Sequence, residues 1–157
     1  MRPGRRPGPG VRVILGDEAA TARLGAAIAR VLRPGEAVCL SGPLGAGKST
    51  LARALVRALT TPDEDVPSPT FTLVQFYEGA GLKIAHFDLY RLTDPDEAYE
   101  IGLDEALDDG AAVIEWPDRL AGRLPPDRLD VEIAIEGAGR AARLTPHGAW
   151  EGRQVEP

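Results

Sequence analysis

The amino-acid sequence predicts an α/β domain with a mostly parallel central sheet, antiparallel additions, and helices on both faces of the sheet. In the first part of the chain, short apolar runs alternate with helical hydrophobic patterns, as expected where buried parallel strands are joined by helices. In the middle and near the end, extended segments are separated by short glycine-rich turns, which are typical of antiparallel hairpins. The length of 157 residues suits a single domain.

The first part of the chain contains two strand–helix pairs. Residues 11–15 form a short strand, and Asp17 can cap a helix that runs to about residue 32. Residues 37–41 (AVCLS) form a short, mostly apolar run, as expected for a strand buried on both faces. A glycine-rich segment and a helix to about residue 59 follow, and the proline-rich residues 60–70 form a loop.

The rest of the chain alternates hairpins with short helices. The expected elements are, in order, strands 71–77 and 82–89, short helices beginning near 94 and at 103–107, and strands 111–114, 128–136 and 140–145. Residues 1–10 hold three arginines and six Gly or Pro, so we expect a disordered basic tail there. We expect residues 11–145 to form the domain and residues 146–157 to form a loose C-terminal tail.

The composition excludes several classes of protein. A hydrophobic content of 43% supports a core, and no apolar stretch approaches the ~20 residues of a membrane helix. Cys39 is the only cysteine, which excludes an internal disulfide and favours a reducing, cytoplasmic setting. Outside residues 1–10 the chain carries 15 basic and 24 acidic side chains, which argues against a broad nucleic-acid surface and against DNA as a partner.

A phosphate-binding pattern follows the second predicted strand. Residues 42–49, GPLGAGKS, match G-x-x-x-x-G-K-[ST]. The run Gly45, Ala46 and Gly47 lets backbone N–H groups point inward around an anion. The strand before this segment and the helix after it are the context that the motif requires, so the fold is predicted to be P-loop NTPase-like.

Three side chains at the end of this loop have separate tasks in the predicted site. Lys48 would reach the β- and γ-phosphates, the Ser49 hydroxyl would bind Mg²⁺, and Thr50 would bond a more distal phosphate oxygen. The chain has two lysines and 16 arginines, so a lysine at this position argues against a chance match. Binding of a nucleoside triphosphate is therefore expected.

Two acidic residues lie at the ends of predicted buried strands, where sites of parallel sheets open. Asp88 ends the strand in IAHFDLYRL and is positioned to hold Mg²⁺ directly or through water. Glu115 follows AAVI and is suited to orient water, accept a proton or help hold the metal. Trp116 has three interpretations: stacking on a base, packing beside the metal site, or plain packing in the core. His86 is interpreted as a packed or hydrogen-bonded structural histidine.

The proline-stiffened loop carries two hydroxyls close to its end. Ser68 and Thr70 stand in the sequence SPTF, before the next predicted strand. Such a loop can close over a γ-phosphate and open after hydrolysis. The alternative is an ordinary turn into a strand.

Four segments, in this order and at these spacings, resemble the TsaE (also called YjeE) family. They are GPLGAGKSTLAR, SPTFTLVQFYEG, IAHFDLYRL and IEWPDRL, and the resemblance covers residues 12–145. Many families share the first segment, whereas the combination of the other three is far more restrictive. The resemblance implies a bacterial P-loop ATPase, with ATP and Mg²⁺ as cofactors, that is needed for threonylcarbamoyladenosine in tRNA. It also implies action on a complex of TsaD and TsaB, with tRNA contacted only through that complex.

The roles that the resemblance implies fall on matching positions. They are phosphate and metal contacts at Lys48, Ser49 and Thr50, a switch-like loop at Ser68 and Thr70, and Mg²⁺-associated acids at Asp88 and Glu115 with Trp116 beside them. Two positions depart from the family pattern. Pro43 stands where the family usually has Asp or Glu and removes a backbone donor. Ser49 replaces the usual Thr, and its hydroxyl can serve the same purpose.

Three other functions compete with this interpretation. A small-molecule P-loop kinase would fit the length and would recruit arginines such as Arg91, Arg119, Arg123 and Arg128, although no long arginine-bearing lid is visible. A GTPase is disfavoured because the chain has no asparagine for an N-K-x-D motif. A binding module without catalysis is the third alternative.

Overall fold

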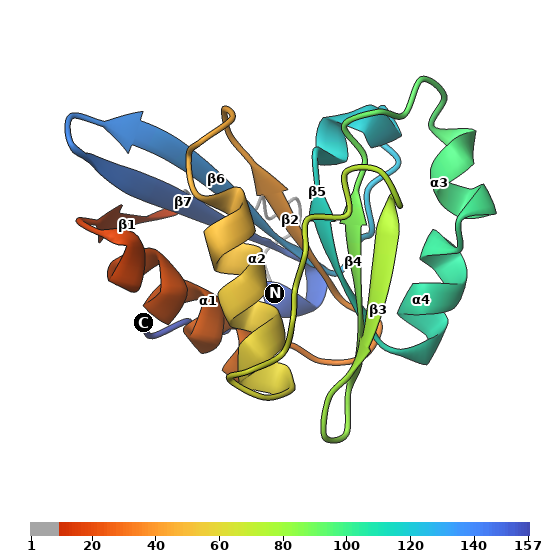
Figure 1. The fold of residues 1–157 in the computed structure, drawn as a ribbon, viewed down its shortest axis with the longest axis horizontal. Coiled ribbons are helices and arrows are strands. Elements are labelled where there is room, and N and C mark those ends of the chain that lie inside the picture. Colours follow the sequence, from red (N-terminus) through yellow and green to blue (C-terminus); the bar gives the residue numbers. More distant parts are fainter. Residues whose placement is uncertain (1–9) are drawn as a thin grey trace, which may run out of the picture.

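The computed structural model describes residues 10–157, so the predicted tail, except for Gly10, lies outside the described residues. Seven strands form one sheet in the order β1-β7-β6-β2-β5-β4-β3, and four helices pack on it (Figure 1). The elements are β1 (Val11–Leu15), α1 (Glu18–Val31), β2 (Ala37–Ser41), α2 (Lys48–Leu59), β3 (Val74–Glu78), β4 (Lys83–Asp88), α3 (Asp96–Glu100), α4 (Leu103–Asp109), β5 (Ala111–Glu115), η1 (Pro117–Leu120), β6 (Arg128–Glu136), β7 (Gly139–His147) and η2 (Gly148–Trp150).

The centre of the sheet is parallel and its margins are antiparallel. Strand β2 pairs in parallel with both β5 and β6, and β4 pairs in parallel with β5. The hairpins β3–β4 and β6–β7, and the pair β1–β7, are antiparallel. Strand β5 is buried along its length, and β2 is buried as far as Leu40, because both faces of the central sheet are covered. The predicted fold class is confirmed.

Helices cover the two faces of the sheet in separate pairs. Helices α1 and α2 lie together on one face, and α3 and α4 lie on the other, beside β4 and β5 (Figure 1). The first pair forms the larger core cluster with Leu40, Leu55 and Val131, among others. The second pair covers a cluster that includes Phe87 and Ile114. No helix within residues 10–157 is both long enough and apolar enough to span a membrane.

Most predicted elements have the bounds that their sequence patterns indicate, and one start is wrong. Asp17 caps α1 as expected, because its Oδ1 accepts the N–H of Ala20 at 2.8 Å. Strand β3 begins at Val74 rather than at residue 71. Leu73 adopts a left-handed φ of 70° and donates its N–H to the carbonyl of Pro69 at 2.7 Å, so the chain turns before it extends.

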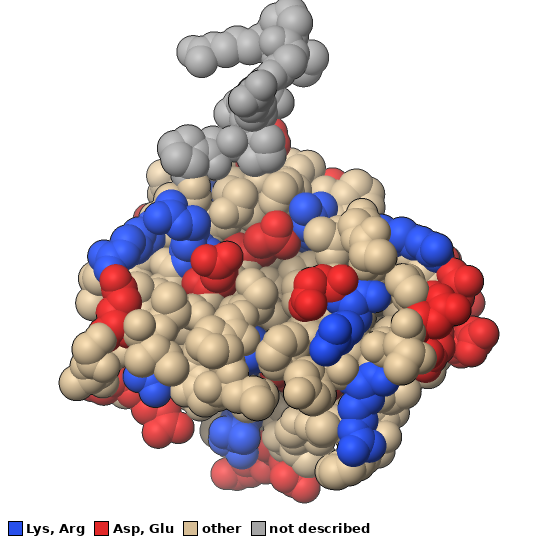
Figure 2. Space-filling view, turned by 90° about the horizontal axis from the view of Figure 1, so that it is seen from above, with Lys and Arg blue, Asp and Glu red and all other residues tan. Residues whose placement is uncertain are grey.

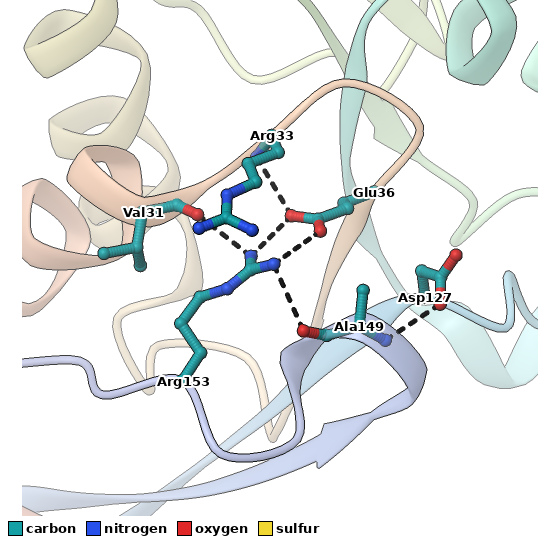
Figure 3. A network of polar contacts seen from close by, with 6 residues as sticks. All are labelled: Val31, Arg33, Glu36, Asp127, Ala149 and Arg153. Carbon is teal, nitrogen blue, oxygen red and sulfur yellow. Dashed lines mark hydrogen bonds and ion pairs between the residues drawn. The ribbon is translucent and has the colours of Figure 1, made fainter.

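The expectation of a loose tail over residues 146–157 is wrong. Strand β7 continues to His147, and the side chain of Trp150 is fully buried against the core. Figure 3 shows the guanidinium of Arg153 beside the carboxylate of Glu36. Glu36 is buried, and the Nη1–Oε1 and Nη2–Oε2 separations are 2.6 and 2.8 Å. Arg153 also donates to the carbonyl of Val31, at the end of α1, at 2.9 Å.

Arg153 and Glu36 form a largely buried ion pair that also makes hydrogen bonds to the backbone. The side chains of Arg153 and Glu36 are only 9% and 6% exposed, and the guanidinium lies 4.5 Å from the ring centroid of Trp150. Glu36 Oε1 also accepts the N–H of Arg33 at 2.9 Å (Figure 3). Removing one partner of such a pair leaves an uncompensated buried charge. The pair therefore fastens the C-terminal segment to the start of β2.

We expect Arg153→Met to lower the free energy of unfolding by about 3 kcal/mol, because the Glu36 carboxylate stays buried without its partner. Urea denaturation followed by circular dichroism measures the change. Arg12→Met is the matched control: its pair with Glu136 is about half exposed, so the loss should stay below about 1 kcal/mol. Equal losses in the two variants would contradict a structural role for the buried pair.

Candidate phosphate-binding site

The glycine-rich loop connects the end of β2 with the start of α2. Gly42 has a φ of 138°, and a Cβ atom there would lie 2.3 Å from the carbonyl oxygen of Ile133 on β6, so the close approach of β6 requires glycine. Gly47 precedes α2 with a φ of 110°. The N–H groups at the start of α2 have no partners inside the helix and point towards the loop. The arrangement suits an anion.

Lys48 is folded back onto this loop. Its Nζ donates to the carbonyls of Gly42 and Pro43, the latter at 3.2 Å, and lies 4.2 Å from the ring centroid of Trp116. The residue is only 6% exposed. Burial lowers the pKa of Lys48, and the nearby carboxylates of Glu115 and Asp88 act in the opposite direction. An anion in the loop would compete with the two carbonyls for this ammonium group.

Asp88 and Glu115 lie side by side because they end neighbouring parallel strands. They are paired in the register of β4 and β5, and each is at most 5% exposed. Asp88 Oδ1 accepts the N–H of Tyr90 at 3.0 Å. Glu115 Oε2 lies 2.6 Å from Nε2 of His86. The structure thus brings the two acids to the same edge of the sheet.

The loop before β3 is fastened to one of these acids. The hydroxyls of Ser68 and Thr70 are 2.8 Å apart, and that of Thr70 donates to Asp88 Oδ2 at 3.2 Å. The carbonyl of Leu73 accepts the N–H of Asp88 at 3.0 Å. Any movement of this loop must therefore break a hydrogen bond to Asp88.

Trp116 stands at the centre of a row of aromatic and cationic groups. It has a left-handed φ of 60°, and its N–H donates to the carbonyl of Leu40 at 3.3 Å. Its ring is 4.8 Å from that of Tyr90, whose carbonyl accepts from Arg119 at 3.2 Å. Trp116 is partly buried and packs both against Lys48 and against the apolar cluster that includes Ile114.

One hollow of about 270 Å³ brings ten of the eleven predicted site residues together. It is lined by Gly45, Gly47, Lys48, Ser49, Thr50, Ser68, Thr70, Asp88, Glu115 and Trp116, with Leu44 at its edge. Ala46 is buried and lines a second hollow of about 270 Å³ on the other side of the loop. Acidic and basic side chains are interspersed over the face seen in Figure 2.

The second hollow was not predicted. It lies between the turn before α1 and the β6–β7 hairpin, and Arg140 of the hairpin donates to the carbonyl of Gly45 at 3.2 Å. Thr50 lines both hollows and lies within hydrogen-bonding distance of Glu18. Arg140 has no motif of its own, and it reaches the loop because β6 pairs with β2 and β7 pairs with β6.

The oxygen atoms in the first hollow form a donor set that fits Mg²⁺. Ser49 offers a hydroxyl, and Asp88 and Glu115 offer carboxylates, which are the hard ligands that this cation prefers. Within residues 10–157 no group of three or more His, Cys, Asp or Glu side chains is placed to hold a metal. A metal here would thus need phosphate oxygens or water to complete its shell.

Comparisons with known proteins agree with one another. The model of the family described as threonylcarbamoyl adenosine biosynthesis protein TsaE matches residues 15–143. The tRNA threonylcarbamoyladenosine biosynthesis protein TsaE of Rickettsia felis is 37% identical over 123 residues, which are 78% of this chain and 72% of that protein. The protein of the same name from Aquifex aeolicus is 44% identical over 108 residues, 68% and 77% of the two chains. The crystal structure of Bacillus subtilis YdiB superposes with a TM-score of 0.74 at 25% identity, over 90% of this chain and 88% of that one.

We expect Thr70→Val to loosen the loop, because the substitution keeps the shape of the side chain but removes its hydrogen bond to Asp88. Amide hydrogen exchange at Leu73 should become roughly fivefold faster, the equivalent of about 1 kcal/mol. Thr72→Val is the control, because the Thr72 hydroxyl bonds only to the exposed side chain of Gln75. The same acceleration in both variants would show that Thr70 does not fasten the loop.

Proposed function

Because the chain belongs to the TsaE family, we propose that it binds and hydrolyses ATP as a component of the machinery that makes threonylcarbamoyladenosine in tRNA. We further propose that it acts on a complex of TsaB and TsaD and meets tRNA only through that complex. One observation carries the proposal for ATP: a phosphate-binding loop, its lysine and two carboxylates from adjacent strands line the same hollow.

The chain's own groups provide phosphate binding and water activation. The loop N–H groups and Lys48 would hold the β- and γ-phosphates, and Lys48 would leave the carbonyls of Gly42 and Pro43 to do so. Mg²⁺ would be held by Ser49 and Asp88, and Glu115 lies beside them. The bound metal would neutralise negative charge on the phosphates. Glu115 orients a water molecule and accepts its proton as the bond to the γ-phosphorus forms and the bond to the ADP oxygen breaks.

The neighbouring features support the same proposal. The second hollow adjoins the loop through Gly45 and Thr50, so it offers space for the nucleoside part of the ligand. In the loop with Ser68 and Thr70, the Thr70 hydroxyl donates a hydrogen bond to Asp88. Because Asp88 would also bind the metal, the position of this loop would depend on whether ATP or ADP is bound. Such a response is what a protein that remodels partner subunits requires.

The structure does not favour the small-molecule kinase. The arginines that such a kinase would recruit already have partners within the fold: Arg91 on the ring of Phe71, Arg119 on the carbonyl of Tyr90, Arg123 on Asp96 and Arg128 on Asp130. A lid that binds an acceptor needs arginines free to swing onto phosphate. Transfer of phosphate from ATP to a metabolite without partner proteins would nevertheless support the kinase.

Substitutions of the loop lysine and of Glu115 test the proposed activity. Lys48→Ala should abolish ATP binding, whereas Glu115→Gln should bind ATP within about threefold of wild type and hydrolyse it about 100-fold more slowly. Filter binding and phosphate release, each with TsaB and TsaD present, measure the two effects. Lys83→Ala is the control, because the only other lysine forms an exposed pair with Asp109 and should change neither quantity.

The outcomes separate the parts of the proposal. Unchanged ATP binding by Lys48→Ala would contradict nucleotide binding at this loop. Hydrolysis by Glu115→Gln at the wild-type rate would overturn the role of Glu115. A pull-down with TsaB and TsaD that does not respond to ATP would contradict the partners and leave the phosphate site standing.

We expect the fluorescence of Trp116 to change when a nucleotide binds. Its ring contacts the ammonium group of Lys48, which would move towards the phosphates. The chain has one other tryptophan, Trp150, which is fully buried in the core. We expect ATP to change the emission of the wild-type protein and not that of Trp116→Phe. Radiolabelled ATP should still bind the variant. A persisting signal in that variant would assign the change to Trp150.

A further inference from the structure

His86 and Glu115 form an isolated buried pair next to the candidate site. His86 lies on β4, two residues before Asp88, and its neighbour in the register on β5 is Val113, two residues before Glu115. The two side chains are 3% and 4% exposed, and Nε2 lies 2.6 Å from Glu115 Oε2. Figure 1 shows β4 and β5 side by side, so the contact spans adjacent strands of the rigid centre of the sheet.

The side chain of His86 makes its polar contact with Glu115 through Nε2. Nδ1 of His86 is buried and has no hydrogen-bond partner among residues 10–157. A buried polar atom without a partner costs about 1–3 kcal/mol, so an apolar side chain of similar shape would serve packing better. The single contact of Nε2 with Glu115 is thus the feature that distinguishes this histidine from a core residue.

The contact also determines which oxygen of Glu115 is available. Of the two ring nitrogens, Nε2 contacts Glu115 and Nδ1 has no partner among residues 10–157, so a proton on Nε2 makes this contact a hydrogen bond donated to the carboxylate. Because Oε2 is held by the ring, Oε1 is the atom left for the hollow that Glu115 lines. Without the ring, the carboxylate is free to turn about its last torsion, which is broad and roughly two-fold.

We propose that His86 is a positioning residue that holds Glu115 in the orientation required for hydrolysis; this rests on the proposed function of Glu115. The donor group lies on β4 and the acceptor on β5, so the sheet itself maintains the geometry. Lys48 lies across the same hollow, and the pair keeps the acid available to water instead of letting it turn to that ammonium group. The role is analogous to that of groups that orient metal ligands or catalytic bases.

The rate of hydrolysis and the affinity for ATP test this role together. His86→Phe should lower kcat about 10- to 100-fold and leave the Kd for ATP within about threefold of wild type. His86→Gln should restore kcat to within about fivefold, because its side-chain N–H reaches nearly as far as Nε2, whereas the shorter His86→Asn should not. In a Glu115→Gln background, His86→Phe should have no further effect on kcat. Thermal unfolding shows whether each variant is folded.

Nuclear magnetic resonance tests the contact without any activity measurement. Only two histidines are present, so His147→Gln assigns the imidazole ¹⁵N signals. We expect a slowly exchanging Nε2–H of His86 in the wild-type protein, shifted in Glu115→Gln. Loss of kcat by the same factor in both backgrounds, equal kcat in His86→Gln and His86→Phe, or no protected Nε2–H would overturn the proposal. A different outcome is that Glu115→Gln hydrolyses ATP at the wild-type rate while the Nε2–H signal of His86 is shifted. That result would support the contact between His86 and Glu115 but contradict the proposed function of Glu115.

Discussion

The parallel pairing of β2, β5 and β4 is the constraint on which the site depends. The register places Leu40 opposite Glu115 and Glu115 opposite Asp88, so three strand ends coincide at one edge of the sheet. Helices cover both faces of these strands, so none of them can slide without exposing apolar side chains. Buried strands therefore fix the positions of the two acids. They also fix the start of the phosphate loop and of the segment with the tryptophan after β5.

The same edge concentrates buried charge, and each charged group has a partner. Lys48, Asp88 and Glu115 are all less than 10% exposed, yet carbonyls, amides, a hydroxyl or an imidazole contact each of them. Burial without such partners would cost several kcal/mol per charge. These contacts hold the three side chains in place, so a polyanion entering the hollow meets a lysine and backbone dipoles that are already oriented.

Local patterns predicted most of the fold and the membership of the site. The apolar runs of β2 and β5, the cap at Asp17 and the loop motif act over a few residues, so their positions can be read from the sequence. Contacts between distant residues could not be predicted in this way. The turn at Leu73 depends on Asp88, Arg140 reaches Gly45 only through the hairpin, and the polar role of His86 appears only when β4 lies beside β5.

The ion pair of Glu36 and Arg153 has a consequence for synthesis on the ribosome. Its partners are 117 residues apart in sequence, and Glu36 lies at the entrance to β2, the strand that leads into the phosphate loop. Since the chain is made from its N-terminus, the carboxylate of Glu36 has no guanidinium partner until residue 153 has emerged. The buried ion pair that joins the segment after β7 to the start of β2 can therefore form only after residue 153 has been synthesised, and it contributes nothing to the stability of shorter nascent chains.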